Sequence, residues 1–283
     1  MQQGQPPQGH GIPIEEAMKD KQMADNMSAI EYKLFIMSGK GGVGKSSVTA
    51  NLAAALAARG YRVGVLDVDL HGPSMPRLLG ATGRVRSEDG QHLTPVTCAG
   101  GITLISMDLF MPDKDKAIMW RGAMKTGAIK QFLTDVEWGQ LDYLLIDSPP
   151  GTGDEHMTVL EAIPDAMSLV VTTPQELALA DVRKALDFLR EEKAPILGIV
   201  ENMGSFFCPG CGKEYAFFKK GGGDSLARAY NIPLLASIPF DPATVEAADE
   251  GKPIVLLEGD SPAKAAFLHL ADTIMLVTGK KTA

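Results

Sequence analysis

The sequence has 283 residues but only three cysteines and no long apolar run. Three cysteines are too few for the disulfide framework of a small secreted protein, so we expect a reducing, cytoplasmic setting. No apolar stretch reaches the roughly 20 residues of a membrane-spanning helix. Residues 1–7 have neither the basic start nor the apolar core of a secretory signal. We therefore expect no association with a membrane.

The chain also lacks an excess of basic residues. It has 27 Lys and Arg against 35 Asp and Glu, a formal net charge of −8. Because nucleic-acid binding needs clustered Lys and Arg to neutralise phosphates, this balance argues against a nucleic-acid partner. Hydrophobic residues make up 45% and charged residues 22%, as in an ordinary globular protein.

Two regions differ in composition. Residues 1–30 are rich in Gln, Gly, Pro, Met and Asp, and we expect a flexible arm with one short helix. From residue 31 to residue 283, apolar runs alternate with helical stretches, as in one α/β domain. The predicted strands are 34–37, 62–67, 102–107, 143–147, 168–172, 196–200 and 234–238. The predicted helices are 47–59, 121–135, 176–192, 224–230, 244–250 and 261–277. Apolar strands without polar alternation predict a mostly parallel sheet with helices on both faces.

Residues 39–46 read Gly-Lys-Gly-Gly-Val-Gly-Lys-Ser and match the phosphate-loop pattern G-x-x-x-x-G-K-[ST]. The glycines allow the backbone to approach phosphate oxygens, and the following helix start attracts anions. We expect Lys45 to reach the β- and γ-phosphates and Ser46 to hold Mg²⁺. The alternative is a glycine-rich turn with no ligand. The candidate nucleotide-binding residues of this segment are Gly39, Lys40, Gly41, Gly42, Val43, Gly44, Lys45, Ser46 and Ser47.

Acidic residues follow two of the predicted strands. Asp67 and Asp69 lie on the same side at the end of one strand, because side chains alternate along a strand. Asp147 ends another and is the best candidate for the second acidic motif of phosphate-loop enzymes, which contacts Mg²⁺. Carboxylates opposite a phosphate loop favour a metal ion and a water between them. Asp67 and Asp69 each have the simpler alternative of capping the next helix.

Asn202 follows the strand predicted at 196–200. Its side-chain amide offers one donor and one acceptor, which match the edge of adenine. The guanine signature Asn-Lys-x-Asp is absent from the sequence. We therefore favour ATP over GTP, although an asparagine at this place is also a common turn residue.

Cys208 and Cys211 are separated by Pro-Gly and followed by glycine. One pair supplies two ligands, whereas a structural zinc or an iron–sulfur cluster normally takes four. Cys98 is distant in sequence and has no spaced partner. A two-fold dimer would bring two pairs together. A bridging [4Fe–4S] cluster, a bridging zinc and a dithiol redox pair are the alternatives, and spacing alone favours zinc.

The phosphate loop with its second lysine, Lys40, resembles the deviant Walker A loop of the MinD/ParA/nitrogenase-iron-protein class. Within that class, the chain resembles the Mrp/ApbC group of iron–sulfur cluster carrier ATPases over about residues 31–275. The segments that carry this resemblance are 39–46, 67–74, 147–154 and 200–212. Many bacterial members carry an additional small N-terminal domain, for which residues 1–30 are too short, and the eukaryotic scaffold relatives carry a four-cysteine N-terminal motif, whereas residues 1–30 contain no cysteine. We therefore expect a single-domain member with only the bridging cluster site.

The resemblance implies a role for individual residues. Lys40 would cross a dimer interface to the partner's nucleotide, which makes it catalytic together with Lys45 and Asp69. Asp69 would orient the attacking water, and Asp67 would support the Mg²⁺ shell that Ser46 and Asp147 contact. The residues that would line the adenine pocket are Asn202, Pro239 and Asp241. The residues that would bind the cluster are Cys208 and Cys211.

The resemblance also reverses the preference for zinc. It implies a homodimeric, cytoplasmic ATPase that binds ATP, Mg²⁺ and a [4Fe–4S] cluster between subunits and delivers the cluster to apo iron–sulfur proteins. One alternative is a positioning ATPase switch of the MinD/ParA type. It would want a basic amphipathic C-terminal helix, and the C-terminus offers only Lys280 and Lys281 as basic residues. Another is a zinc-bridged targeting ATPase, which is disfavoured because the 14 methionines are scattered.

Overall fold

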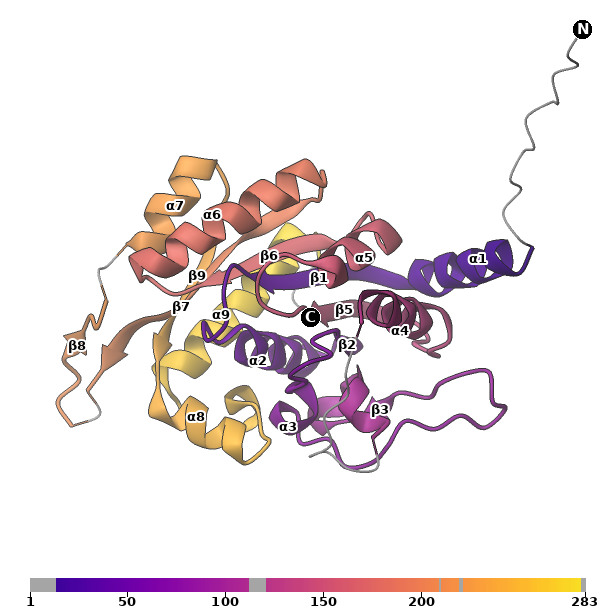
Figure 1. Cartoon of the computed structure of the whole chain (residues 1–283). Helices are drawn as coiled ribbons and strands as arrows, with labels where there is room; N and C mark the ends of the chain where they lie inside the picture. Colours follow the sequence, from indigo (N-terminus) through magenta and orange to yellow (C-terminus); the bar gives the residue numbers. More distant parts are fainter. Residues whose placement is uncertain (1–13, 112–120, 209, 219–220, 281–283) are drawn as a thin grey trace, which may run out of the picture.

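A single sheet forms the centre of the protein. The computed structural model describes residues 14–111, 121–208, 210–218 and 221–280. Within these residues the sheet has nine strands in the order β3-β4-β2-β5-β1-β6-β7-β8, and β9 also pairs with β7 (Figure 1). The strands are β1 Ile30–Ser38, β2 Val63–Asp67, β3 Val96–Thr97, β4 Thr103–Ser106, β5 Leu141–Asp147, β6 Met167–Thr172, β7 Ile196–Phe207, β8 Glu214–Tyr215 and β9 Leu234–Phe240. The β3–β4 and β7–β8 pairings are antiparallel, and the others are parallel.

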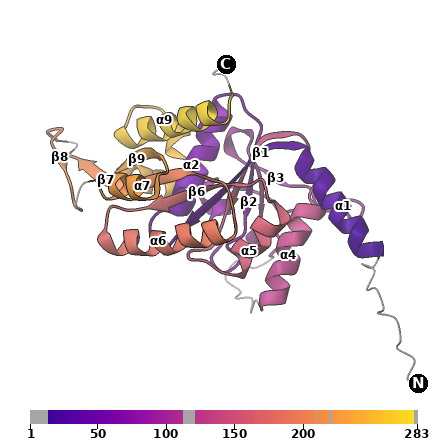
Figure 2. The same ribbon diagram turned by 90° about the horizontal axis from the view of Figure 1, so that it is seen from above.

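Helices cover both faces of this sheet, as Figure 2 shows. The helices α2 Lys45–Ala58 and α9 Pro262–Val277 lie on one face. The helices α4 Gly122–Thr134, α5 Asp154–Ala162 and α6 Glu176–Glu191 lie on the other. The remaining elements are α1 Ile14–Ser28, α3 Met75–Leu78, α7 Gly222–Tyr230, α8 Pro242–Asp249, η1 Ala99–Gly101, η2 Met107–Leu109 and η3 Ile254–Leu256. The predicted α/β architecture is confirmed.

The central strand β1 shows why its sequence is apolar without interruption. Leu34 and Ile36 pack into the core on the α2/α9 face, whereas Phe35 and Met37 pack into the core on the opposite face. Because side chains alternate along a strand, a strand covered on both faces needs apolar residues at every position. All four side chains are fully buried.

Helix α1 occupies part of the segment for which we expected an arm with one short helix. It is 15 residues long and packs against α4. Its last turn provides the anchor, because the Asn26 side chain donates a hydrogen bond of 2.6 Å to the carbonyl of Thr134 and Met27 is buried. Residues 1–13 lie outside the described residues, and the division at residue 30 remains a prediction.

Strand β7 differs from its prediction in length. It runs from Ile196 to Phe207, seven residues beyond the predicted end at Val200. Asn202 therefore lies within the strand, not just after it. The extension pairs with β8 to form a hairpin that projects beyond the helices at the left edge of Figure 1. The extension gives no apolar run in the sequence, because residues 201–205 contain one apolar side chain, Met203, among polar residues and glycine.

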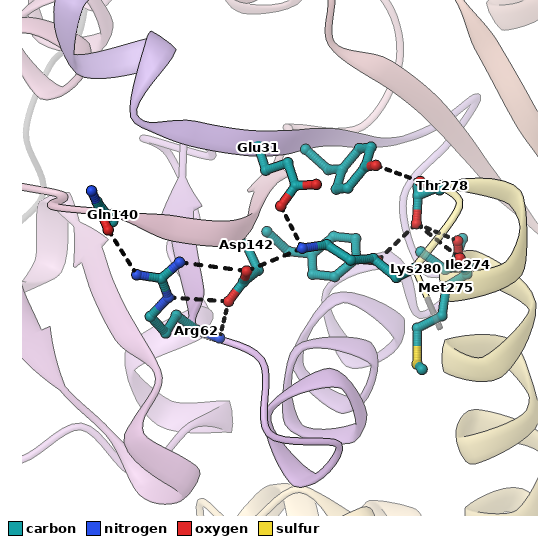
Figure 3. Close-up of polar contacts among 10 residues, drawn as sticks. Glu31, Arg62, Gln140, Asp142, Ile274, Met275, Thr278 and Lys280 are labelled. Carbon is teal, nitrogen blue, oxygen red and sulfur yellow. Dashed lines mark hydrogen bonds and ion pairs between the residues drawn. The ribbon is translucent and has the colours of Figure 1, made fainter. Parts of the chain in front are cut away.

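The chain after α9 is held at the opposite, amino end of the strands. The Lys280 ammonium contacts the carboxylates of Glu31 and Asp142 (Figure 3). It also lies over the rings of Tyr32 and Tyr61. The Asp142 carboxylate also accepts hydrogen bonds from Arg62, so these charges form a network. This network joins the C-terminal segment to the starts of β1 and β5.

Candidate nucleotide site and cysteine pair

The phosphate loop connects β1 to α2, and the local geometry requires glycine at three of its positions. Gly42 and Gly44 have φ angles of 80° and 79°, in the left-handed region that side chains disfavour. A Cβ atom on Gly44 would also lie 2.3 Å from Nδ2 of Asn202. A Cβ atom on Gly39 would lie 2.4 Å from the carbonyl carbon of Asp181 in α6. The loop is thus wedged between β7 and α6.

A cleft of about 240 Å³ lies along this loop. The loop from Lys40 to Ser47 forms one side, and Asp69 and Pro150 line it as well. Asp69 comes from the segment after β2 and Pro150 from the segment after β5, so residues far apart in sequence meet at the carboxyl ends of neighbouring strands. This position at the edge of a parallel sheet is where ligands bind in such folds.

Asp147 is the centre of the polar contacts beneath the cleft. Its carboxylate is fully buried and accepts hydrogen bonds of 2.7 Å from the Lys45 ammonium and 2.7 Å from the Ser46 hydroxyl. Thr49, one turn along α2, donates a third of 2.6 Å. The oxygen atoms of the Ser46 hydroxyl and the Asp147 carboxylate lie side by side, and Mg²⁺ prefers oxygen ligands of this kind. The sequence reasoning missed Thr49, although its spacing places it on the helix face of Lys45.

Asp67 lies beside Asp147 on the neighbouring strand and is also buried. Its carboxylate accepts hydrogen bonds from two backbone N–H groups and, at 3.1 Å, from the Ser106 hydroxyl. Burial, followed by the charge of Asp147, raises the pKa of Asp67 to about 8, and the Lys45 charge opposes this. Lys45 is thus the cation beside two buried carboxylates.

Asp69 and Lys40 line the same cleft, and both are half-buried. The Asp69 carboxylate accepts a hydrogen bond of 3.2 Å from the backbone N–H of Gly72. The Lys40 carbonyl accepts one of 3.0 Å from the Ser38 hydroxyl. Their positions are compatible with the predicted roles toward a water and a partner's nucleotide, and these roles remain predictions.

A second cavity of about 210 Å³ adjoins the cleft, because Gly44 and Ser47 line both. Asn202, Pro239 and Asp241 all line this second cavity, so the structure brings together the three residues predicted to surround the base. The Asn202 amide group donates a hydrogen bond of 2.9 Å to the carbonyl of Val43. Asn202 therefore also fixes the position of the phosphate loop.

Two polar atoms at this cavity are buried without a partner among the described residues. Asp241 caps α8 by accepting a hydrogen bond of 3.0 Å from Ala243 through Oδ1, while its Oδ2 atom has no partner. The Thr244 hydroxyl, one turn into α8, also has none. Because unpaired buried polar groups are costly, these atoms favour a ligand with polar edges. Sequence reasoning missed Thr244, which only the start of α8 at Pro242 brings next to Asp241.

The cysteine pair lies in a tight turn at the tip of the β7–β8 hairpin. The backbone N–H of Cys208 donates to the carbonyl of Lys213 at 3.0 Å, and that of Gly212 donates to the carbonyl of Cys208 at 2.8 Å. Gly212 has a φ angle of 70°, which favours glycine. Cys208 is half-buried and Cys211 is exposed. Pro209 lies outside the described residues.

The turn favours the thiolate form of Cys208. Hydrogen bonds from the backbone of Gly210, then from the backbone and side chain of Cys211, lower the pKa of the Cys208 thiol. The thiolate is the form that binds metals. Cys98 has the opposite environment, because burial raises its thiol pKa to about 11.

The pair alone supplies only two of the four ligands that a structural zinc or an iron–sulfur cluster normally takes. In the part of the chain that the structure describes, no group of three or more His, Cys, Asp or Glu residues could hold a metal ion. Cys98 is buried between β3 and η1 and is separate from the hairpin. Further ligands for a four-thiolate site must therefore come from elsewhere.

The parallel sheet, the phosphate loop and the buried aspartates beside it define a P-loop nucleoside triphosphatase. The family model described as ParA, NUBPL iron-transfer P-loop NTPase, matches residues 29–275. The chain belongs to this family.

Similar proteins have been described in archaea and animals. An iron-sulfur cluster carrier protein of Methanococcus maripaludis is 48% identical over 91% of this chain and 89% of its own length. The human cytosolic Fe-S cluster assembly factor NUBP2 is 43% identical over 89% of this chain and 95% of its own length. The structure of a nucleotide-binding protein from Archaeoglobus fulgidus in complex with ADP is 40% identical, with a TM-score of 0.74, and covers 85% of this chain and 94% of that chain.

None of the helices in the described residues has both the length and the apolar character needed to cross a membrane.

Proposed function

We propose that this protein is an ATPase that binds a [4Fe–4S] cluster between two subunits and transfers it to apo iron–sulfur proteins. The observation that carries the proposal is the exposed turn with Cys208 and Cys211, which directly follows the strand that lines the base cavity at Asn202. The printed names of the relatives, which are iron–sulfur cluster carriers and assembly factors, support the choice of cargo.

The nucleotide half of the proposal follows from the cleft. The loop backbone and Lys45 would bind the phosphates of ATP, and Lys45 would move from Asp147 to the β/γ oxygens. Ser46 and Asp147 would hold Mg²⁺, with Asp67 behind them, and Mg²⁺ neutralises charge on the phosphates. Asp69, across the cleft, would orient the attacking water, and Lys40 would act on the nucleotide of the partner subunit.

The cluster half follows from the hairpin. Two copies of the Cys208–Cys211 pair supply the four thiolates that a [4Fe–4S] cluster takes. The projecting, exposed position of the turn lets thiolates of a client protein replace those of the carrier. A buried site would hold the cluster more permanently and would not serve as a donor. We propose a cytosolic location, in keeping with the name of the human relative.

One rival is a membrane-positioning switch of the MinD/ParA type, which would use basic residues that are free to bind lipid. Lys280 does not fit this role, because it is engaged by Glu31 and Asp142 at the end of the sheet (Figure 3). This rival also assigns no role to the cysteine pair. The zinc-bridged targeting ATPase remains as the rival that the metal content distinguishes.

The experiment that tests the proposal is cluster transfer. The protein reconstituted without oxygen is mixed with an apo-ferredoxin in the presence of an iron chelator. Transfer that proceeds despite the chelator supports direct delivery. Loss of the cluster to the chelator, with no holo-ferredoxin formed, contradicts it.

Lys40→Ala is expected to suppress ATP hydrolysis while sparing most ATP binding. Lys40 lines the cleft, but Lys45 is the lysine that contacts Asp147 beneath it. Loss of one charged group that acts only in the transition state costs about 10²- to 10³-fold in turnover. Steady-state hydrolysis and equilibrium ATP binding measure the two effects separately. The matched control is Lys252→Ala, outside the cleft, and equal hydrolysis by wild type and Lys40→Ala would exclude the role across the dimer.

Asp241→Asn is expected to weaken the preference for ATP over GTP by about 10-fold or more, about the value of one hydrogen bond to a charged group. Asparagine retains an oxygen for the cap on Ala243 but replaces the unpaired acceptor Oδ2 with a donor. An acceptor suits the amino group of adenine, whereas a donor suits the carbonyl of guanine. Competition binding with both nucleotides measures the ratio, and Asp249→Asn, also at the cavity, is the control. An unchanged ratio would remove Asp241 from base recognition.

A further inference from the structure

The segment that carries the two cysteines begins and ends beside a single buried carboxylate. We call residues 204–223 the cysteine loop. At its two ends lie Gly204 in β7 and Gly223 in α7. Between them lies the carboxylate of Glu201, which is 5% exposed. Its Oε1 accepts a hydrogen bond of 2.9 Å from the Ser237 hydroxyl, and its Oε2 accepts one of 2.8 Å from the backbone N–H of Gly223.

Both end glycines are in close contact with this carboxylate. A Cβ atom on Gly204 would lie 3.2 Å from Oε1 of Glu201 and 2.5 Å from Oγ of Ser237. A Cβ atom on Gly223 would lie 2.9 Å from Oε2 of Glu201. Neither position has room for a side chain. The two ends of the cysteine loop are therefore packed against opposite sides of one carboxylate.

The same carboxylate replaces a missing helix cap. Helix α7 begins after Gly221, which has no side chain to bind the free N–H groups of the first turn. Glu201 supplies the acceptor from a distant strand, and its negative charge is stabilised at the positive end of the helix. This explains why a carboxylate is buried at this position. It also means that the end of the cysteine loop depends on Glu201.

The residues after Glu201 connect it to the nucleotide site. Asn202 donates to the carbonyl of Val43 in the phosphate loop. Met203 lines the base cavity and has a φ angle of 57°, which is uncommon for a residue other than glycine. The ladder between β7 and β9 changes register between Asn202 and Phe206. The strand that joins the two sites is thus irregular where it passes the base cavity.

We propose that Glu201 is a positioning residue that clamps both ends of the cysteine loop and transmits the presence of nucleotide from Asn202 and Met203 to Cys208 and Cys211. This inference rests on the proposed function for the meaning of the two sites. A nucleotide in the base cavity contacts Asn202 and Met203, shifts the adjacent clamp, and so changes the accessibility of the two thiols.

The test uses the metal-free full-length protein under reducing, oxygen-free conditions. Alkylation of each cysteine by iodoacetamide is followed by mass spectrometry, with and without Mg-ATP. In the wild type, nucleotide is expected to change the rate at Cys208 or Cys211 at least about fivefold, the lower end of typical coupling between sites. Cys98 is the internal reference, because its buried thiol should react slowly in both states.

Variants at the clamp separate positioning from general stability. Glu201→Ala is expected to keep ATP binding but lose the effect of nucleotide on the alkylation rate. Glu201→Gln is expected to restore it, because its amide oxygen still accepts from Gly223 and its amino group can donate to Ser237. If Glu201→Ala does not fold, Ser237→Ala takes its place in the test, and we expect a smaller effect of nucleotide on its alkylation rate.

Two results would overturn the inference. The first is no effect of nucleotide on the alkylation rate of either thiol in the wild type. The second is the full effect of nucleotide in folded Glu201→Ala, or in Ser237→Ala where Glu201→Ala does not fold. Because no metal is present, neither result depends on whether the protein carries a cluster. A protein that shows the nucleotide effect but takes up no cluster would contradict the proposed function alone.

Discussion

Lys45→Ala is expected to weaken ATP binding at least about 100-fold. Lys45 is buried and is the cation closest to the carboxylate of Asp147, at 2.7 Å. Hydrogen bonds to charged groups contribute about 1.5–3 kcal/mol each, and each 1.4 kcal/mol is a factor of about 10 in affinity. The variant loses two such bonds to the β- and γ-phosphates and leaves the buried Asp147 carboxylate beneath the cleft without its lysine partner. Equilibrium binding of ATP with Mg²⁺ measures the loss.

The same substitution also affects stability, and the two effects can be separated. Breaking a buried ion pair costs about 3–5 kcal/mol, because one charge stays buried without a partner. Lys45→Met combined with Asp147→Asn removes both charges, so it should recover most of the free energy of unfolding but not ATP binding. Lys33→Ala is the control, because Lys33 is a buried lysine of β1 whose partner Asp165 lies outside the cleft. Unimpaired ATP binding by folded Lys45→Ala would exclude the assigned role.

Cys208→Ser and Cys211→Ser are each expected to abolish stable cluster binding. By two-fold symmetry a single substitution removes two of the four thiolates at once. Serine is similar in size, Cys211 is exposed and Cys208 is only partly buried, so the fold should be unaffected. Iron and sulfide analysis after oxygen-free reconstitution, together with the visible absorption spectrum, measures the loss.

Cys98→Ser is the matched control for this pair of variants. Cys98 is buried, its thiol pKa is raised to about 11, and it lies apart from the hairpin. Its replacement should therefore leave cluster content at the wild-type level. A cluster that survives in Cys208→Ser, or that disappears in folded Cys98→Ser, would contradict the assignment of the ligands.

The phosphate loop could be predicted from sequence because its functional groups are neighbours along the chain. Residues 39–46 carry the glycines, the lysine and the serine in one turn, and local geometry brings them together. The apolar strands were equally clear, since burial on both faces leaves an uninterrupted apolar signal, as in β1. These two signals were sufficient for the fold class and for the position of the nucleotide site.

The contacts between distant segments could not be predicted in the same way. Thr49 and Ser106 are ordinary polar residues until the sheet places them beside Asp147 and Asp67. The length of β7 depends on its pairing with β8 and β9, and this pairing cannot be predicted from the residues of β7 alone. The clamp at Glu201 is also invisible in sequence, because its two contacts come from α7 and β9.

The central claim is that two chains share one cluster through four cysteines, and iron content measured together with molecular mass tests it most directly. Wild-type protein reconstituted without oxygen is separated by size with in-line mass determination, and each fraction is analysed for iron, sulfide and zinc. The account predicts a dimer with about four irons per two chains and the broad absorption of an iron–sulfur cluster. A protein that binds only zinc, or that carries its iron as a monomer, would contradict it.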